Sequence, residues 1–239
     1  MKHFRLVEKV DTSVFLSELE RTIGSGYISS DFGLSNYKKW QEETNYKSNH
    51  PHSGWVYLVS AFPVGEEYRE KCNDNSPLLY RTPLCKHFPK TFAYLEHIAE
   101  KERGTLQRVC IVLLPPGKDV LPHPDTGTYY KHRNRYHLVL QGNKGSEFTA
   151  ADEKQIFKEG EVWWFANKEV HSVKNLSTNA RIHVIFDILP NEYYSLRDKI
   201  TNSLFQWILG QLRRTLGKEG FARYLDTHHF LRNSIIYRK

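Results

Sequence analysis

Short strand-like runs of apolar residues fill the second half of the chain, and the pattern begins at residue 106. The runs cover residues 106–117, 135–142, 161–166, 170–176 and 180–189, and each is bounded by Gly, Pro or Asn. Several short strands at this spacing indicate an antiparallel sandwich or barrel. We therefore expect a mainly β fold whose core is a double-stranded β-helix, the jelly-roll or cupin-like architecture.

Helical periodicity flanks these runs on both sides. Residues 12–22 carry a broad apolar face after a Thr or Ser cap, and residues 91–102 form a second helical pattern that stops before Gly104. The pattern returns in residues 193–216, read as one helix or two, and in residues 221–230. The sequence thus predicts N-terminal and C-terminal α-helices around the β core.

One domain, residues 1–239, accommodates all of these elements. We divide it into an N-terminal helical or mixed region (1–105), a jelly-roll catalytic core (106–190) and C-terminal helices (191–239). Residues 25–90 are rich in Gly, Ser, Asn, Pro and aromatic residues, which predicts loops with one or two strands.

Cysteine usage and charge indicate the compartment. The three cysteines, Cys72, Cys85 and Cys110, form no CxxC pair, which favours a reducing interior. No apolar run approaches the roughly 18 residues that cross a bilayer, and the N-terminus is too charged for a signal peptide. We expect a cytoplasmic protein without a membrane partner; its oligomeric state stays open.

The net charge of +7 is concentrated near the end of the chain. From Asn191 onward, nine Lys or Arg residues face four Asp or Glu residues. Such a segment is either a solvated basic helix surface or a nucleic-acid footprint. It would also attract an anionic substrate.

Candidate chemistry begins with an HxD triplet, His123-Pro124-Asp125, and a histidine 48 residues later, His171. Two imidazoles and one carboxylate on one face of a metal leave adjacent positions open, as non-haem Fe(II) oxygenases require. Zinc could use the same residues, although structural zinc sites favour cysteine. Alone, the triplet is also compatible with a chance arrangement among twelve histidines.

Three further polar residues lie on the predicted strands. Arg181 begins the last strand, which a jelly roll brings beside the strand of Arg135 and His137. These two side chains alternate with Tyr136 and Leu138 and therefore share one face. A buried arginine there could hold one end of a dicarboxylate; the other readings are a surface arginine and a core histidine.

Residues 106–190 resemble the catalytic core of the aspartyl/asparaginyl β-hydroxylase family, Fe(II)- and 2-oxoglutarate-dependent oxygenases with a jelly-roll core. The individual elements are short, but their order and spacing together are specific. They are Pro116-Gly117, Pro122-His123, Arg135-x-His137-Leu138, Gly160-x-Val162, Phe165, His171-x-Val173 and Arg181.

The resemblance implies a ligand set. His123 and His171 would bind iron, Arg181 would bind the distal carboxylate of 2-oxoglutarate, and His137 would lie near its C1 carboxylate. Arg135 would face the cosubstrate or the substrate. The cofactors would be Fe(II), 2-oxoglutarate and O2, with succinate and carbon dioxide as coproducts.

This sequence departs from the animal protein hydroxylase of the family at two positions. Asp125 stands where that enzyme has glycine, as in the similar free-proline hydroxylases, so we expect a complete triad of two histidines and one carboxylate. Val112 stands where that enzyme has a serine assisting the cosubstrate arginine. We expect another hydroxyl to assist Arg181.

The substrate is the least determined part. The loop at residues 126–134 carries Tyr129, Lys131 and Arg133, which are candidates for binding it. The resemblance and this basic loop favour a free amino acid or an Asp/Asn-like residue. Two alternatives remain open: a cupin-like metalloenzyme that needs no 2-oxoglutarate, and a basic jelly-roll module that binds nucleic acid.

Overall fold

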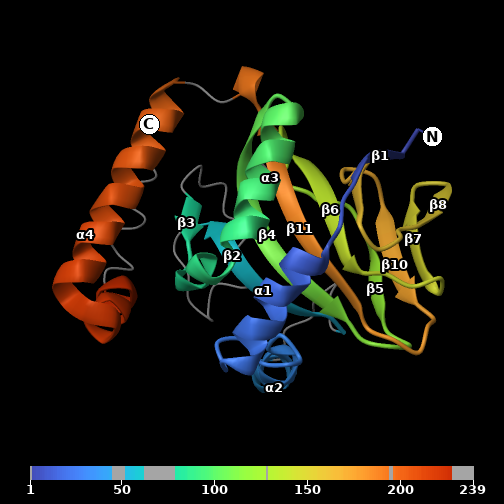
Figure 1. Cartoon of the computed structure of the whole chain (residues 1–239), viewed down its shortest axis with the longest axis horizontal. Coiled ribbons are helices and arrows are strands. Elements are labelled where there is room, and N and C mark those ends of the chain that lie inside the picture. The colour runs from blue at the N-terminus through green and yellow to red at the C-terminus, as the bar shows by residue number, and fades with distance from the viewer. Residues whose placement is uncertain (1, 45–51, 62–78, 128, 194–195, 228–239) are drawn as a thin grey trace.

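Two antiparallel sheets form the body of the protein (Figure 1). The computed structural model describes the chain except for residues 1, 45–51, 62–78, 128, 194–195 and 228–239. The larger sheet has the order β1 (Phe4–Lys9), β9 (Glu161–Phe165), β6 (Asn134–Gln141), β11 (Arg181–Pro190), β4 (Gly104–Leu114), β2 (Gly54–Ala61), β3 (Leu79–Arg81). The smaller has the order β5 (Asp119–His123), β10 (His171–Asn175), β7 (Ser146–Ala150), β8 (Glu153–Ile156). The predicted mainly β, jelly-roll architecture with flanking helices is confirmed.

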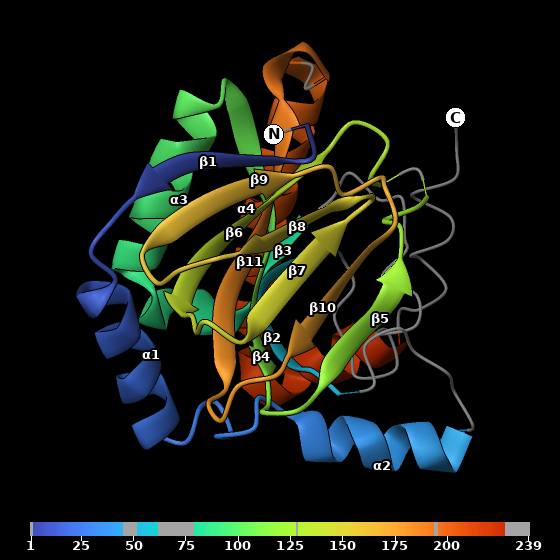
Figure 2. The same cartoon turned by 90° about the vertical axis from the view of Figure 1, so that its right-hand side faces the viewer.

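Apolar side chains fill the space between the two sheets, which lie face to face in Figure 2. Alternate residues of each strand point inward because the side-chain period of a strand is two. The two inner faces meet through Leu114, Val139, Phe165, Phe148 and Val173. Polar side chains on the same inner faces are therefore brought into an enclosed, apolar setting.

The outer face of the larger sheet is covered by α1 (Ser13–Gly24) and α3 (Pro89–Lys101). Phe15 and Leu19 of α1 pack with Leu95 and Ile98 of α3 over the outward-facing strand residues. Burying a side chain of this size contributes about 1.5–3 kcal/mol. These helices anchor the larger sheet, and they correspond to the helices predicted at 12–22 and 91–102.

A buried carboxylate caps α3. Glu18 of α1 accepts hydrogen bonds from the backbone N–H of Lys90 (2.7 Å) and Thr91 (2.9 Å) and from the Thr91 hydroxyl (2.7 Å). The first N–H groups of a helix have no partner within it, and a negative charge there also favours the helix dipole. Glu18 thus joins the two helices through a polar contact inside their apolar interface.

Two elements of the N-terminal region were not predicted. β1 is an edge strand with Leu6 turned outward at 41% exposure, so its sequence lacks a clear apolar alternation. α2 (Leu34–Thr44) lies in the segment read as loops and strands, which corrects that reading. Asp31 starts α2 by accepting the N–H groups of Gly33 and Ser35, and hydrogen bonds, foremost that of Ser35, lower the pKa of Asp31 to about 2.

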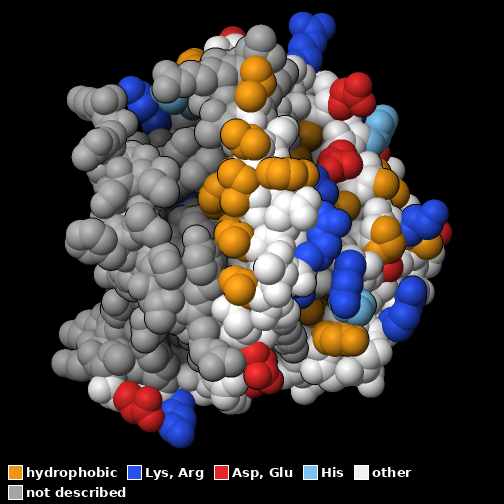
Figure 3. Space-filling model, turned by 90° about the vertical axis from the view of Figure 1, so that its left-hand side faces the viewer, with side chains coloured by type: hydrophobic (Ala, Val, Ile, Leu, Met, Phe, Trp, Pro, Cys, Tyr) orange, Lys and Arg blue, Asp and Glu red, His pale blue; other side chains and the backbone are white. Residues whose placement is uncertain are grey.

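The C-terminal helix α4 (Leu196–Thr227) stands beside the sheets and is interrupted at Gly217, whose φ of 67° breaks the helical path. Hydrophobic side chains lie along one face of α4 (Figure 3), where Ile200, Leu204, Trp207 and Ile208 are each at least 42% exposed. Two short 3-10 helices, η2 (Pro83–His87) and η3 (Asn191–Tyr193), complete the described elements. No helix of the described chain combines the length and apolar character needed to span a membrane.

Candidate metal and anion site

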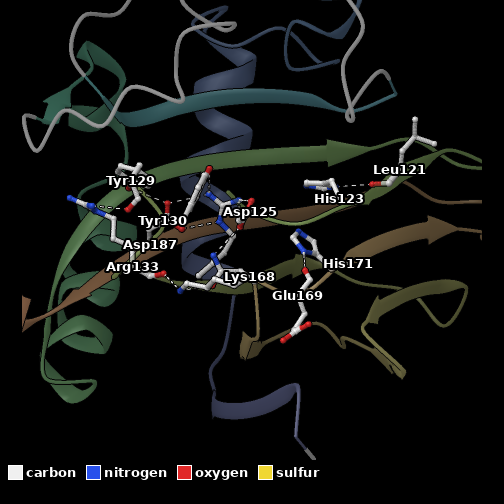
Figure 4. A network of polar contacts seen from close by, with 12 residues as sticks. Leu121, His123, Asp125, Tyr129, Tyr130, Arg133, Lys168, Glu169, His171 and Asp187 are labelled. Atoms are coloured by element: carbon white, nitrogen blue, oxygen red, sulfur yellow. Dashed lines mark hydrogen bonds and ion pairs between the residues drawn. The ribbon is translucent and has the colours of Figure 1, made fainter. Parts of the chain in front are cut away.

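Two histidines face each other at the end of the smaller sheet. His123 is the last residue of β5 and His171 the first of β10, and the two are paired across the strand ladder. Their ring centroids are 4.4 Å apart, and Figure 4 shows the rings directed toward one another. The HxD triplet and the distant histidine are therefore brought together by strand pairing.

Backbone carbonyls fix the tautomer of each imidazole. Nδ1 of His123 lies 2.8 Å from the carbonyl of Leu121, and Nδ1 of His171 lies 2.9 Å from the carbonyl of Glu169. A carbonyl only accepts, so each Nδ1 carries the proton and each Nε2 carries the lone pair. Burial lowers the pKa of His171 to about 4, which keeps its ring neutral at physiological pH.

Asp125 supplies a carboxylate beside these rings. One ligand atom from each of His123, Asp125 and His171 lies within 4.8 Å of the others, and all three residues are buried. Asn167 holds Asp125 twice: its carbonyl accepts the Asp125 N–H (2.9 Å), and its Nδ2 donates to Oδ2 (3.1 Å). Two imidazoles and one carboxylate suit iron(II), and the carbonyl and amide contacts are the kind of support that metal ligands receive.

Arg135 links Asp125 to a second buried carboxylate, Asp187. Nη1 of Arg135 lies 3.1 Å from Oδ1 of Asp125, while its Nε and Nη2 donate to Asp187 at 2.8 and 3.2 Å. Burial opposes this charge, but the two carboxylates outweigh it and raise the pKa of Arg135 well above its ordinary value. The guanidinium expected to face cosubstrate or substrate is thus engaged by protein carboxylates, including the candidate metal ligand.

Arg181 is in the opposite electrostatic situation. It is 4% exposed, and among the described residues no carboxylate pairs with it. Its Nη2 contacts Nδ1 of His183 at 2.9 Å, and burial lowers the pKa of Arg181 to about 9. A buried cation without a counter-ion is costly, so this position is suited to an anionic ligand.

An aromatic residue connects this arginine to the histidine pair. The Phe148 ring centroid lies 5.8 Å from the Arg181 guanidinium carbon and 6.1 Å from the His171 ring. His137 packs edge-on against Phe148 at 5.4 Å, and its Nδ1 lies 3.1 Å from that of His183. The strand neighbours β6 and β11, predicted to lie side by side, do pair and bring His137 close to Arg181.

The candidate substrate residues divide between interior and surface. Tyr129 is fully buried and donates to Oδ2 of Asp187 (3.1 Å), as Figure 4 shows. Arg133 is buried as well, donating to the Tyr129 carbonyl (2.7 Å) and to Oε1 of Gln107 (3.0 Å). Only Lys131 of the three is exposed. Their role in binding a substrate stays a prediction.

Sequence reasoning assigned no role to three residues of the site. Asp187 and His183 share the inner face of β11 with Arg181; alternation places His183 on the same side as Arg181 and could have pointed to Asp187 as well. Asn167 follows β9 in a loop and carries no periodic signal. Among the described residues, Nη2 of Arg181 contacts Nδ1 of His183 (2.9 Å) and Nδ1 of His137 (3.4 Å), and the hydroxyl expected to assist this arginine stays a prediction.

Comparison with known proteins gives one family. The family described as aspartyl/asparaginyl beta-hydroxylase matches residues 35–190. The chain is 30% identical over 115 residues to L-proline cis-4-hydroxylase of Rhizobium meliloti (strain 1021). That alignment covers 47% of this chain and 39% of the relative, so the chain spans well under two thirds of that enzyme's length.

Two solved structures are similar to parts of the fold. The viral collagen prolyl hydroxylase of Paramecium Bursaria Chlorella virus-1, in its 2OG complex, has a TM-score of 0.44 at 11% identity, covering 79% of this chain and 97% of that one. A predicted oxalate decarboxylase of Thermotoga maritima has a TM-score of 0.30 at 21% identity, covering 38% of this chain and 71% of that one.

Proposed function

The chain belongs to the aspartyl/asparaginyl β-hydroxylase family, and on that premise we propose that it is an Fe(II)- and 2-oxoglutarate-dependent dioxygenase that hydroxylates an unactivated C–H bond. The observation that carries this proposal is a buried arginine without a carboxylate partner in the described chain, Arg181, set in the same β barrel as the cluster of His123, Asp125 and His171. The first offers a place for an anion and the second a place for a metal.

The residues have separate roles in this reaction. His123, Asp125 and His171 would hold the iron, and Arg181 would bind the distal carboxylate of 2-oxoglutarate in a charge-assisted pair. When bound, iron and 2-oxoglutarate supply the oxidising chemistry: O2 is consumed, the keto acid becomes succinate and carbon dioxide, and one oxygen atom enters the substrate C–H bond.

The protein supplies orientation and a dry setting. Asn167 and Arg135 hold the Asp125 carboxylate in one place, so that it is presented to a metal without rearrangement. Phe148 and Phe165, which pack around His171, make the surroundings apolar and exclude water from the reacting atoms.

A free amino acid, or a residue like aspartate or asparagine, is the proposed substrate. The name of the Rhizobium relative, L-proline cis-4-hydroxylase, supports a free amino acid. A cupin-like metalloenzyme without 2-oxoglutarate would not need Arg181. Such an enzyme would carry the desolvation cost of this buried cation without an anionic ligand to offset it. We therefore favour the dioxygenase.

Anaerobic titration of the Fe(II)-loaded protein with 2-oxoglutarate tests the proposal directly. We expect a 2-oxoglutarate-dependent absorption band, its loss in Arg181→Ala, and succinate formation on admission of O2 with free proline and other amino acids as substrates. His97→Ala, on the exposed face of α3, is the matched control and should behave as wild type. Absence of the band in the wild-type protein, or its persistence in Arg181→Ala, would refute the assignment.

A further inference from the structure

His183 carries a polar atom for which the described structure offers no partner. It lies on the inner face of β11, two residues after Arg181, and is completely buried. Its Nε2 makes no hydrogen bond to any described residue. Leaving such a group unsatisfied costs roughly as much as a lost hydrogen bond, so an unpaired imidazole nitrogen in a barrel interior calls for a ligand.

The contact with Arg181 determines which nitrogen of His183 holds the proton. A guanidinium can only donate, so Nδ1 of His183, 2.9 Å from Nη2 of Arg181, accepts that hydrogen bond, and Nδ1 of His137, 3.1 Å away, is then the donor in the contact between the two rings. Burial, and after it the charges of Arg181 and His137, lowers the pKa of His183 well below its ordinary value, so the ring is neutral. A neutral ring with an accepting Nδ1 carries its proton on Nε2, and the unpartnered atom is therefore an N–H donor.

We propose that His183 is a second ligand for the anion bound by Arg181: its Nδ1 orients the guanidinium, and its Nε2–H donates to the distal carboxylate of 2-oxoglutarate. This inference rests on the proposed function, since it assigns a further residue to the same cosubstrate. Val112 is the cross-strand neighbour of His183 on β4 and offers no hydrogen bond. Of the two imidazoles that Arg181 contacts in the described part of the chain, that of His183 makes the shorter contact and is therefore placed to assist it.

A neutral donor suits this position physically. The carboxylate brings one negative charge, which Arg181 balances, and a second cation would leave the buried site with an excess positive charge. An N–H on a ring wedged among aromatic side chains, with His137 at 5.4 Å and Phe157 at 6.1 Å between ring centroids, is also fixed in direction. The site would therefore be organised before the cosubstrate binds.

Three variants separate hydrogen bonding from packing. His183→Phe keeps an aromatic ring and removes both nitrogens, His183→Gln keeps an amide donor that reaches about as far as Nε2, and His183→Asn keeps an acceptor near Nδ1 without that reach. The measurement is the dissociation constant of 2-oxoglutarate for the Fe(II)-loaded protein under anaerobic conditions. His97→Phe is the control for adding an aromatic ring elsewhere.

We expect His183→Phe to weaken 2-oxoglutarate binding by roughly 10- to 150-fold, the range for a hydrogen bond to a charged group. His183→Gln should bind more tightly than His183→Asn, and iron affinity should be unchanged in all three, because His183 contacts none of the candidate metal ligands. Equal binding by wild type and His183→Phe overturns the inference. If His183→Phe does not fold, equal dissociation constants of 2-oxoglutarate for His183→Gln and His183→Asn overturn the inference instead.

An analogue identifies which end of the cosubstrate is involved. 2-Oxopentanoate has a methyl group where 2-oxoglutarate has its distal carboxylate, so His183→Phe should not weaken its binding further. An equal loss for both ligands would mean that His183 acts elsewhere. Failure of the wild-type protein to bind 2-oxoglutarate at all would instead refute the proposed function.

Discussion

Replacing Arg181 by methionine, which has a similar length and no charge, should make the ligand-free protein more stable. Burial lowers the pKa of Arg181 to about 9, well below its ordinary value, and at 1.36 kcal/mol per pKa unit this difference is a penalty of about 5 kcal/mol against the folded cation. The substitution also removes a hydrogen bond and leaves the acceptor on His183 unpaired, which together destabilise the variant by roughly 2–3 kcal/mol. The net stabilisation should be about 2 kcal/mol, or a rise of roughly 4–8 °C in the melting temperature.

Because burial lowers the pKa of Arg181, the sign of its effect on stability is determined. Above about pH 9 the unfolded chain keeps a proton that the folded chain begins to lose, whereas at neutral pH both states are protonated and folding carries the whole penalty. The penalty decreases only as the pH rises above about 9. A ligand carboxylate that pairs with Arg181 would remove it at neutral pH.

Thermal unfolding of wild type and Arg181→Met, with and without Fe(II) and 2-oxoglutarate under anaerobic conditions, measures both consequences. Saturating 2-oxoglutarate at 100 times its dissociation constant should stabilise the wild type by about 2.7 kcal/mol and leave the variant unchanged. Arg135→Met is the matched control, because its two carboxylate partners would be left unpaired and the cost should be about 3–5 kcal/mol. A natively folded Arg181→Met that melts below wild type would refute the reasoning.

Three other predictions test separate parts of the structure. Asn167→Ala removes one hydrogen bond to the Asp125 carboxylate and should weaken metal binding by roughly 10- to 100-fold; a titration with Co(II) followed by absorption measures this, and unchanged affinity would exclude the role. Glu18→Ala leaves the first N–H groups of α3 without partners and should cost about 2–4 kcal/mol in urea unfolding, whereas Glu20→Ala at an exposed position should cost little. Burial keeps the pKa of His137, His171 and His183 below 6.5, so below that pH the unfolded chain takes up more protons than the folded chain. The free energy of unfolding should therefore fall by roughly 1.4 kcal/mol per pH unit for each histidine as the pH decreases from about 6 to 5. Equal unfolding midpoints at the two pH values would contradict this.

The strands of the barrel could be predicted where alternation and burial coincide. Five runs became β4, β6, β9, β10 and β11, which carry most of the inner face. β7 and β8 were not predicted because their hairpin is short and half polar, with burial that alternates residue by residue. In those strands sheet pairing decides the conformation, since local propensity is weak.

The site was predictable in its candidate ligands and not in its supporting contacts. The spacing of His123, Asp125 and His171 can be read from the sequence, but the hold of Asn167 on Asp125 arises only when two loops meet. Arg135 was assigned to the cosubstrate or the substrate because the sequence does not fix the strand register that sets Asp187 opposite it. Pairing between β6 and β11 creates that contact, with Asp187 opposite Arg135.

The pairing of β1 with β9 has a consequence for the order in which the protein folds. Phe4, buried between the sheets, is opposite Phe165 in the ladder. During synthesis at 5–20 residues per second, roughly 8–30 s separate the appearance of these two residues at the ribosome. β1 cannot pair with β9 before that interval has passed, so we expect closure of the larger sheet to be a late, long-range step of folding.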